Sequence, residues 1–393
     1  MHIGWIDISK EQRNKVLSVL KLLAEPGALD ELGIGTIRDA FSDIFFPGTS
    51  TIQTRAKYLF IVPYIMLELE REDLKPHEFL NLLSEKELQL IDVLAKDGVQ
   101  GVIGADARES LKRKPSSIYW NALRVYGFFA HESLTLTEYV RAFCSAKSNR
   151  QRIKYLGHKR SDEEDTSDDQ DSACRVLNLW RVPVPPPNWR DGLIINLTGD
   201  EAAYLKEKIL TMPKTKDSLL ALILRENRVD FCAYEKFTDI DNLLSLMPES
   251  MRSDYLLAKD FAEFIYGAQI RYNVLFTKGH SEYVNEEWQK WRASIPSLNL
   301  DSLFVRLNVK SRSLRDFLRS FQNFVQGNDT EKIDNLIIAR EKQLKGPSRS
   351  KLTNRNLYQY NGKLVNMVRL NYRFHYAQRI IADIFEGLGE RNV

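Results

Sequence analysis

The sequence predicts a mainly α protein, with two or three packed helical domains and at most minor short strands. Apolar residues recur at three- and four-residue spacing along most of the chain, which is the period of one helix face. Capping motifs and Pro-Gly turns separate these stretches. With 393 residues, 43% of them hydrophobic and 28% charged, the chain can bury several cores.

Residues 1–160 are predicted to form an N-terminal helical domain. A capping box formed by Ser9 and Gln12 begins a first helix, because each residue can satisfy a backbone group of the first turn. Apolar residues at helical spacing predict a second helix over residues 34–45.

A tight turn is expected after this second helix, at Phe46-Pro-Gly. Thr49-Ser-Thr follows the turn and supplies caps for a third helix, which reaches about Glu70. Glycines at positions 98, 101 and 104 predict a flexible loop, and Pro115 begins another helix.

Residues 161–192 are predicted to form an acidic loop and a proline-rich connector. Residues 162–171 carry seven acids and no apolar side chain, so we expect a solvated, mobile loop. The run Pro185-Pro-Pro favours a stiff extended connector between domains.

A middle helical domain is expected over residues 193–295. Residues 193–197 are apolar enough for a short strand, and a capping box at Thr198 and Glu201 begins the next helix. The predicted helices of this domain cover residues 201–210, 219–225, 254–276 and 282–292.

Residues 296–393 are predicted to form a basic, helical C-terminal region. Helical periodicity covers residues 314–325, 331–344 and 364–388. A polar stretch, residues 346–355, separates the last two helices.

Neither a membrane anchor nor a disulfide framework is expected. No run of eighteen apolar residues occurs, and the first residues lack the pattern of a signal peptide. The three cysteines, Cys144, Cys174 and Cys232, lie far apart in the sequence. These observations predict a cytoplasmic protein.

The sequence contains no recognisable catalytic motif. It has no Gly-Lys-Ser/Thr for a phosphate loop, no G-x-S-x-G elbow and no pair of histidines at metal-binding spacing. We therefore predict no cofactor, no metal and no small-molecule substrate. Dispersed carboxylates such as Asp7, Asp39 and Asp43 leave a metal-dependent nuclease as a minor alternative.

Positive charge concentrates near the C-terminus. Residues 340–379 contain ten Lys or Arg and one acid, Glu341. On an ideal helix over residues 364–388, Arg369, Tyr372, Arg373, Tyr376 and Arg379 fall within about 120° of arc.

Arginines pair with phosphates and tyrosines stack on bases, so this composition favours nucleic-acid binding. Charge reversal at Arg369, Arg373 and Arg379 is expected to abolish salt-sensitive binding. The predicted nucleic-acid contacts are Lys345, Arg349, Lys351, Arg355, Lys363, Arg369, Tyr372, Arg373, Tyr376 and Arg379.

A second set of phosphate contacts is predicted near the N-terminus, where a turn leads into polar and basic residues. This entry resembles that of a recognition helix, although plain helix capping explains it as well. The candidate contacts are Thr51, Gln53, Arg55 and Lys57.

Several strings of residues resemble an uncharacterised bacterial family that is known only as a domain of unknown function. They are Gly4-Trp-Ile-Asp, Asp30-Glu-Leu-Gly-Ile-Gly, Phe46-Pro-Gly-Thr-Ser-Thr-Ile-Gln-Thr-Arg-Ala-Lys-Tyr and Pro115-Ser-Ser-Ile-Tyr-Trp-Asn. The resemblance runs over the full chain. It implies a component of bacterial anti-phage defence islands, with helicases and phospholipase-D-like nucleases as neighbours and no established catalytic residues.

These observations lead to one leading hypothesis. The chain is expected to be a non-enzymatic subunit of an anti-phage complex that binds DNA without sequence specificity or associates with a helicase and a nuclease. The alternative is a protein-only scaffold whose basic surface docks on an acidic patch, such as residues 162–171.

Overall fold

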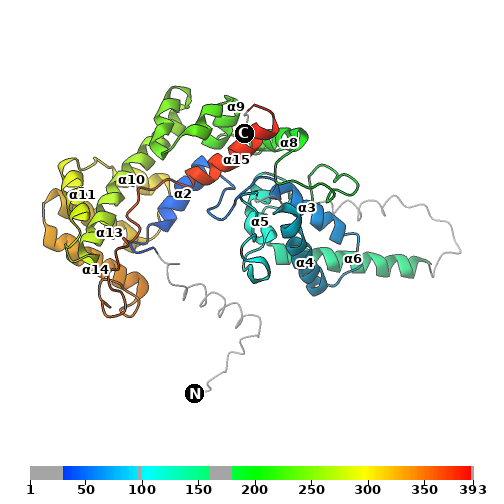
Figure 1. The fold of residues 1–393 in the computed structure, drawn as a ribbon, viewed down its shortest axis with the longest axis horizontal. Helices are drawn as coiled ribbons and strands as arrows, with labels where there is room; N and C mark the ends of the chain where they lie inside the picture. Colours follow the sequence, from blue (N-terminus) through cyan, green and yellow to red (C-terminus); the bar gives the residue numbers. More distant parts are fainter. Residues whose placement is uncertain (1–29, 96–98, 159–178, 391–393) are drawn as a thin grey trace, which may run out of the picture. The chain divides into compact units, whose positions relative to one another are not determined.

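The computed structural model describes residues 30–95, 99–158 and 179–390. It confirms the predicted fold class, since the described residues are 60% helical and about 1% strand (Figure 1). In chain order the helices of this part are α2 (Gly35–Phe45), α3 (Tyr58–Leu69), α4 (Pro76–Leu94), η2 (Arg108–Ser110), α5 (Pro115–Val125), α6 (Leu136–His158), α8 (Gly199–Thr211), α9 (Leu219–Arg225), η3 (Val229–Ala233), η4 (Phe237–Leu246), α10 (Glu249–Phe276), α11 (Glu282–Ala293), α12 (Leu300–Arg306), α13 (Arg312–Gln326), α14 (Thr330–Lys345) and α15 (Phe374–Gly387).

Most predicted helices are confirmed to within a few residues. The capping box at Thr198 is present, because its side chain accepts from the Glu201 amide at 3.2 Å and the Glu201 carboxylate accepts from the Thr198 amide at 2.9 Å. The predicted first helix after Ser9 and the acidic loop at residues 162–171 lie outside the described residues.

Two predictions at the start of elements are wrong. Residues 193–197 form irregular backbone with a bend at residues 195–196 rather than a strand. Helix α3 begins at Tyr58 instead of directly after Thr51. The reason for the late start is local, because the Gln53 side chain donates to the Gly48 carbonyl and accepts from the Ser50 amide, each at 3.0 Å, and so closes a loop.

The chain divides by its contacts into two compact units, each built from segments that are distant in the sequence. Unit 1 comprises Met1–Phe41 and Arg252–Leu370, and unit 2 comprises Ser42–Met251 and Asn371–Val393. This division follows tertiary contacts rather than order along the chain. The four sequence segments proposed as domains remain a prediction.

The core of unit 2 forms around helix α3, which is apolar on nearly every face. Ten of its twelve residues are buried, and it packs against α4 and α5. Elsewhere in this unit α15 packs beside α8 (Figure 1). Both sequence segments of unit 2 therefore contribute packed helices to it, the first with α3 and the last with α15.

Unit 1 contains the amphipathic helices α13 and α14, which pack together, and the long helix α10. Helix α13 buries one apolar stripe, which includes Leu314, Phe317 and Phe321, and it packs against α14. On α10, Gly267 allows the Trp291 ring to approach closely, since a Cβ at this glycine would lie 2.2 Å from ring carbons. Close packing of a large ring therefore depends on the absence of one side chain.

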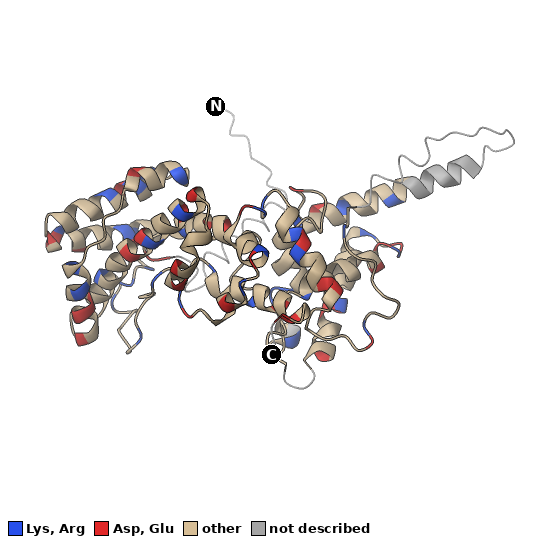
Figure 2. Ribbon diagram, turned by 90° about the horizontal axis from the view of Figure 1, so that it is seen from above, with Lys and Arg blue, Asp and Glu red and all other residues tan. Residues whose placement is uncertain are grey.

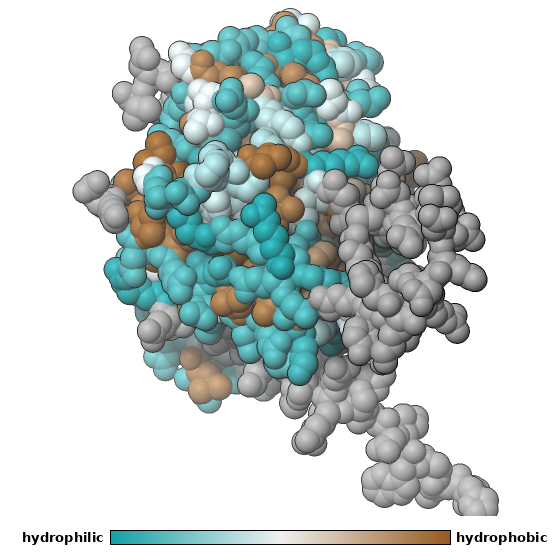
Figure 3. All heavy atoms as spheres, turned by 90° about the vertical axis from the view of Figure 1, so that its right-hand side faces the viewer, coloured by the Kyte–Doolittle hydropathy of each residue, from teal (hydrophilic) through white to brown (hydrophobic). Residues whose placement is uncertain are grey.

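The surface of the described residues is of mixed character. Basic and acidic residues are interspersed along the helices (Figure 2). On one face, hydrophobic residues form small separate groups among hydrophilic ones (Figure 3). No helix within the described ranges is long and apolar enough to cross a membrane.

Candidate functional site

The strongest candidate surface in unit 1 is residues 346–370, hereafter the basic segment. It follows helix α14 and contains turns and irregular backbone but no helix or strand. It carries five Lys or Arg and no Asp or Glu. Three buried side chains from elsewhere in unit 1 contact it, and its own Arg355 reaches two backbone carbonyls of α10; together these contacts determine its course.

The first anchor is the carboxylate of Glu341 on α14, which is fully buried. It accepts hydrogen bonds from the Tyr272 hydroxyl at 2.7 Å, the Ser350 hydroxyl at 2.8 Å and the backbone amides of Leu352 and Lys351 at 3.0 and 3.1 Å. Four donors to one carboxylate satisfy a buried charge that would otherwise be costly. The beginning of the basic segment is thereby fixed to α14.

The second anchor is Glu31, whose side chain is 6% exposed. Its carboxylate accepts from the ammonium groups of Lys345 and Lys351 at 2.8 and 3.1 Å and from the side-chain amide of Asn366 at 2.6 Å. Burial alone would raise the pKa of Glu31, but the hydrogen bonds and positive charges of the two lysines outweigh it and lower the pKa. Glu31 is therefore ionised and holds two points of the basic segment.

Helix α10 supplies the other two contacts. The buried Asn273 amide group donates to the Val365 carbonyl and accepts from the Val365 amide, each at 2.8 Å. Arg355 donates to the Leu275 and Phe276 carbonyls at 2.9 and 3.4 Å, at the C-terminal end of α10 where a cation is favourable. The basic segment is thus bound at two points, Arg355 and Val365, to the last turns of α10.

Sequence reasoning missed these anchors. Glu31 lies more than three hundred residues before its lysine partners, and Asn273 lies 92 residues before Val365. No spacing rule relates positions so far apart, so only the folded chain identifies them.

Six of the ten predicted nucleic-acid contacts lie in unit 1, and they differ in exposure. Lys345 is buried in its pair with Glu31, whereas Arg349 and Lys363 are exposed. Arg369 is half exposed, but it pairs with Glu263 at 2.6 Å and lies 4.0 Å from the centre of the Tyr266 ring.

The other four predicted contacts, which lie in unit 2, do not share one helix face. The predicted helix over residues 364–388 is wrong in its first ten residues, because α15 begins at Phe374. Tyr372 and Arg373 precede it with φ of 50° and 64°, in the left-handed region. The 120° arc calculated from an unbroken helix therefore does not exist.

Long-range packing explains this break. The Tyr372 ring is 1% exposed and lies 6.1 Å from Phe45 and 5.0 Å from Phe237, measured between ring centres. Arg373 donates to the Asp43 carboxylate at 2.7 Å. These contacts outweigh the local helix propensity. Arg379 is exposed on α15 and Tyr376 is partly exposed.

Most residues of the second predicted set of phosphate contacts are buried in unit 2 and bind other residues of the protein. Thr51 is exposed, but Gln53, Arg55 and Lys57 are buried. The Lys57 ammonium group donates to both Glu201 oxygens, at 2.8 and 2.6 Å. These side chains hold protein segments together in the folded chain.

Arg55 makes the more extensive set of contacts. Its guanidinium group donates to the Asp383 carboxylate at 2.8 Å and to the Asn196 side chain at 3.2 Å, and Asp383 also accepts from the Ala56 amide at 2.6 Å. Burial raises the pKa of Asp383 to about 6, although Arg55 lowers it in part. The loop before α3 is joined to α15 by this pair.

The acids predicted as a dispersed metal site pair with arginines where the structure describes them. Asp39 pairs with Arg38 at 3.2 Å and Asp43 pairs with Arg373 at 2.7 Å, while Asp7 lies outside the described residues. In residues 30–95, 99–158 and 179–390 no three His, Cys, Asp or Glu side chains gather where they could hold a metal ion.

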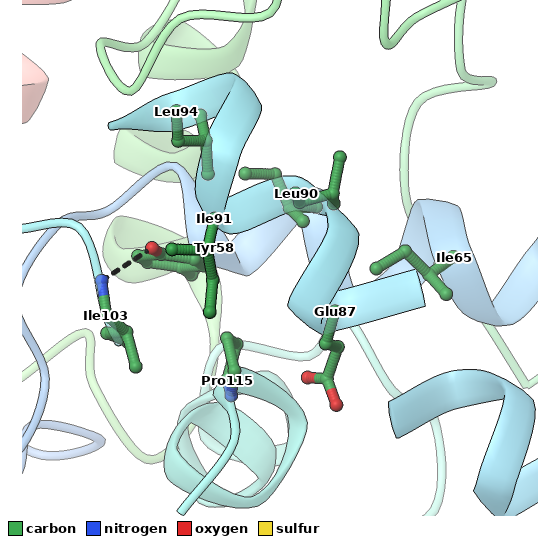
Figure 4. A pocket seen from close by; sticks show the side chains of 9 residues that line it. Tyr58, Ile65, Glu87, Leu90, Ile91, Leu94, Ile103 and Pro115 are labelled. Atoms are coloured by element: carbon green, nitrogen blue, oxygen red, sulfur yellow. Dashed lines mark hydrogen bonds between the residues drawn. The ribbon is translucent and has the colours of Figure 1, made fainter. Parts of the chain in front are cut away.

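One buried carboxylate does have an unusual environment. Glu87 borders a cavity of about 10 Å³, also lined by Tyr58 and Ile91 (Figure 4), and accepts from the Ser116 amide at 2.5 Å and its hydroxyl at 3.0 Å. Burial raises the pKa of Glu87 to about 7. The cavity holds about one water molecule at most, which excludes a substrate.

Comparison with known proteins gives a match for part of the chain. No curated protein and no solved structure matches it. The resemblance predicted from the sequence is confirmed in its N-terminal part, and its extension over the remaining residues stays a prediction. Residues 1–150 match the model of a family of unknown function (DUF6361), to which this part of the chain is similar.

Proposed function

We propose that this protein is a non-enzymatic, nucleic-acid-binding subunit and that the basic segment is its contact surface. The observation that carries the proposal is the charge of that segment, five cations without one acid in residues 346–370. Lys351 and Arg369 pair with Glu31 and Glu263 from outside the segment, and the remaining positive charge attracts the phosphate backbone independently of sequence.

The side chains available for phosphate differ from those expected on a helix. Arg349 and Lys363 are exposed, and Arg355 is hydrogen-bonded to neutral carbonyls, so no acid offsets its charge in those contacts. Tyr360 is 40% exposed and adds an aromatic ring to the same segment. Cations beside accessible aromatic rings are typical of surfaces that bind single-stranded nucleic acid.

The anchors of the segment also support the proposal. Glu341 and Asn273 bind its backbone and Glu31 binds two of its side chains, so binding does not have to order a free loop. With only two or three phosphate contacts, we expect micromolar affinity that falls as salt rises.

A wider role is proposed from the resemblance noted in the sequence. We propose that the protein acts in a bacterial anti-phage complex together with a helicase and a nuclease. Co-purification of such subunits with the tagged protein from its native host tests this part independently of nucleic-acid affinity.

The direct test is fluorescence anisotropy with labelled single-stranded and double-stranded DNA at 50 and 200 mM salt. Arg349→Glu and Lys363→Glu should each weaken binding and reduce its dependence on salt. Lys310→Glu is the matched control, because it makes the same charge change at an exposed lysine of unit 1 outside the segment.

Lys363→Glu is the more informative of the two variants, because Arg349 also donates to the Lys345 carbonyl at 3.1 Å. Reversing Arg369 or Arg373 would break their pairs with Glu263 and Asp43, so a loss of binding would be ambiguous. No binding of either DNA at 50 mM salt would overturn the proposal and favour the protein-only scaffold.

A further inference from the structure

The basic segment lines an open hollow of about 430 Å³ within unit 1, here called the segment pocket. This volume lies in the range of small-molecule sites, about 300–1,000 Å³. Its polar lining includes Tyr358, Gln359, Asn361 and Lys363 from the basic segment. None of these residues except Lys363 was a candidate from the sequence.

The lining combines three chemical groups that suit one kind of ligand. Tyr358 offers an aromatic ring, and Gln359 and Asn361 offer amide groups that both donate and accept hydrogen bonds. Lys363 is exposed and provides a positive charge. The one acid in the lining, Glu31, is already offset by Lys345 and Lys351.

We infer that the segment pocket binds one unpaired nucleobase of a single strand, with Lys363 on a neighbouring phosphate. This inference rests on the proposed function and names the strand type and the site. Bases have flat faces that stack on aromatic rings, and their edges pair with amide side chains. Without duplex partners, these faces and edges are accessible to the protein.

The nature of the lining argues against other ligand classes. A simple anion needs no aromatic ring, and a cationic ligand would be repelled by Lys351 and Lys363. A base joined to phosphate uses the ring, the amides and the lysine at once. The volume of the segment pocket accommodates one nucleotide.

The test compares two labelled 12-residue strands, oligodeoxythymidine and a fully abasic strand with the same number of phosphates. We expect the wild-type protein to bind the thymidine strand at least about fivefold more tightly, since stacking and pairing of one base distinguish the probes. Anisotropy titrations at 50 mM salt measure this ratio.

Substitutions then assign the difference to the segment pocket. Tyr358→Ala should reduce the ratio to about one, and Tyr358→Phe should preserve it because the ring remains. Tyr283→Ala is the matched control, a tyrosine of unit 1 that is 57% exposed outside this site. Lys363→Gln should weaken the binding of both strands equally, whereas Lys310→Gln should leave both affinities unchanged.

The outcomes separate this inference from the proposed function. Equal binding of both strands by the wild type overturns the base site and leaves phosphate binding intact. If Tyr358→Ala and Tyr283→Ala change the ratio of the two affinities to the same extent, the base site is also overturned. Failure of both strands to bind overturns the proposed function together with the inference.

Discussion

The Asn273 side chain pairs with the backbone of Val365 through two hydrogen bonds of 2.8 Å, one in each direction. A neighbouring β-strand would satisfy the same two backbone groups, but here one buried amide group does so from a helix. The position of a long irregular segment is thus determined by single side chains rather than by regular structure.

Asn273→Ala should destabilise the protein by about 2 kcal/mol, because it leaves the Val365 carbonyl and amide without these partners. Urea unfolding followed by circular dichroism measures the loss. Asn285→Ala is the control, since Asn285 donates one exposed hydrogen bond to the Gly279 carbonyl and should cost far less. Equal losses for the two variants would contradict the anchoring role of Asn273.

Glu87→Gln should change how stability depends on pH. The pKa of Glu87 is about 7 in the folded state, above its ordinary value of 4.5, so the folded protein holds the proton longer than the unfolded chain. Between about pH 5 and 8 this group makes the wild type less stable by about 2–3 kcal/mol as pH rises. The variant lacks that loss and should be the more stable protein at pH 8.

Urea midpoints at pH 5, 6, 7 and 8 check this expectation. Glu85→Gln, an exposed position on the same helix, should keep the wild-type profile. If Glu87→Gln and the wild type lose stability in parallel, Glu87 is not the titrating group.

Gly267→Ala should destabilise the protein by about 1–3 kcal/mol, although alanine favours helices. The added Cβ would lie 2.2 Å from the Trp291 ring, which is buried and donates to the Glu263 carbonyl at 2.8 Å. The ring therefore cannot move without losing contacts. Gly35→Ala, where the nearest atom would be 3.5 Å away, should be neutral or stabilising in thermal unfolding.

Arg55→Met should cost about 3–5 kcal/mol at pH 8, because it leaves the buried Asp383 carboxylate without its cation. The loss should be smaller at pH 5, where the carboxyl group of Asp383 can take up a proton. Thermal unfolding at both pH values measures it, with the exposed Lys310→Met within about 0.5 kcal/mol of the wild type. An Arg55→Met protein of unchanged stability but weaker DNA binding would instead favour the phosphate contact first predicted for Arg55.

The comparison of sequence and structure separates local from distant causes. Helices such as α9 and α11 were predicted within a residue because their periodicity and caps lie within the helix itself. The final helix was extended too far because Tyr372 packs against Phe45 and Phe237, which no local pattern reveals.

The candidate site was predicted in composition but not in geometry. An excess of cations can be counted along the chain, which is why residues 340–379 were recognised. Whether a cation faces solvent or a buried acid depends on tertiary partners, as with Lys345 and Glu31. Gln359 and Asn361 are uncharged, so composition does not single them out. Only the hollow that they line makes them candidates.

The pairing of early acids and bases with late ones has a consequence for dissecting this protein. Residues 1–150 carry the family resemblance, but Glu31, Arg55 and Lys57 find their partners at Lys345, Asp383 and Glu201. A fragment that ends at residue 150 would retain three buried charges and lose every one of these counterions. We therefore expect the portion that matches the family model to be unstable when it is expressed alone, so functional work should use the whole chain.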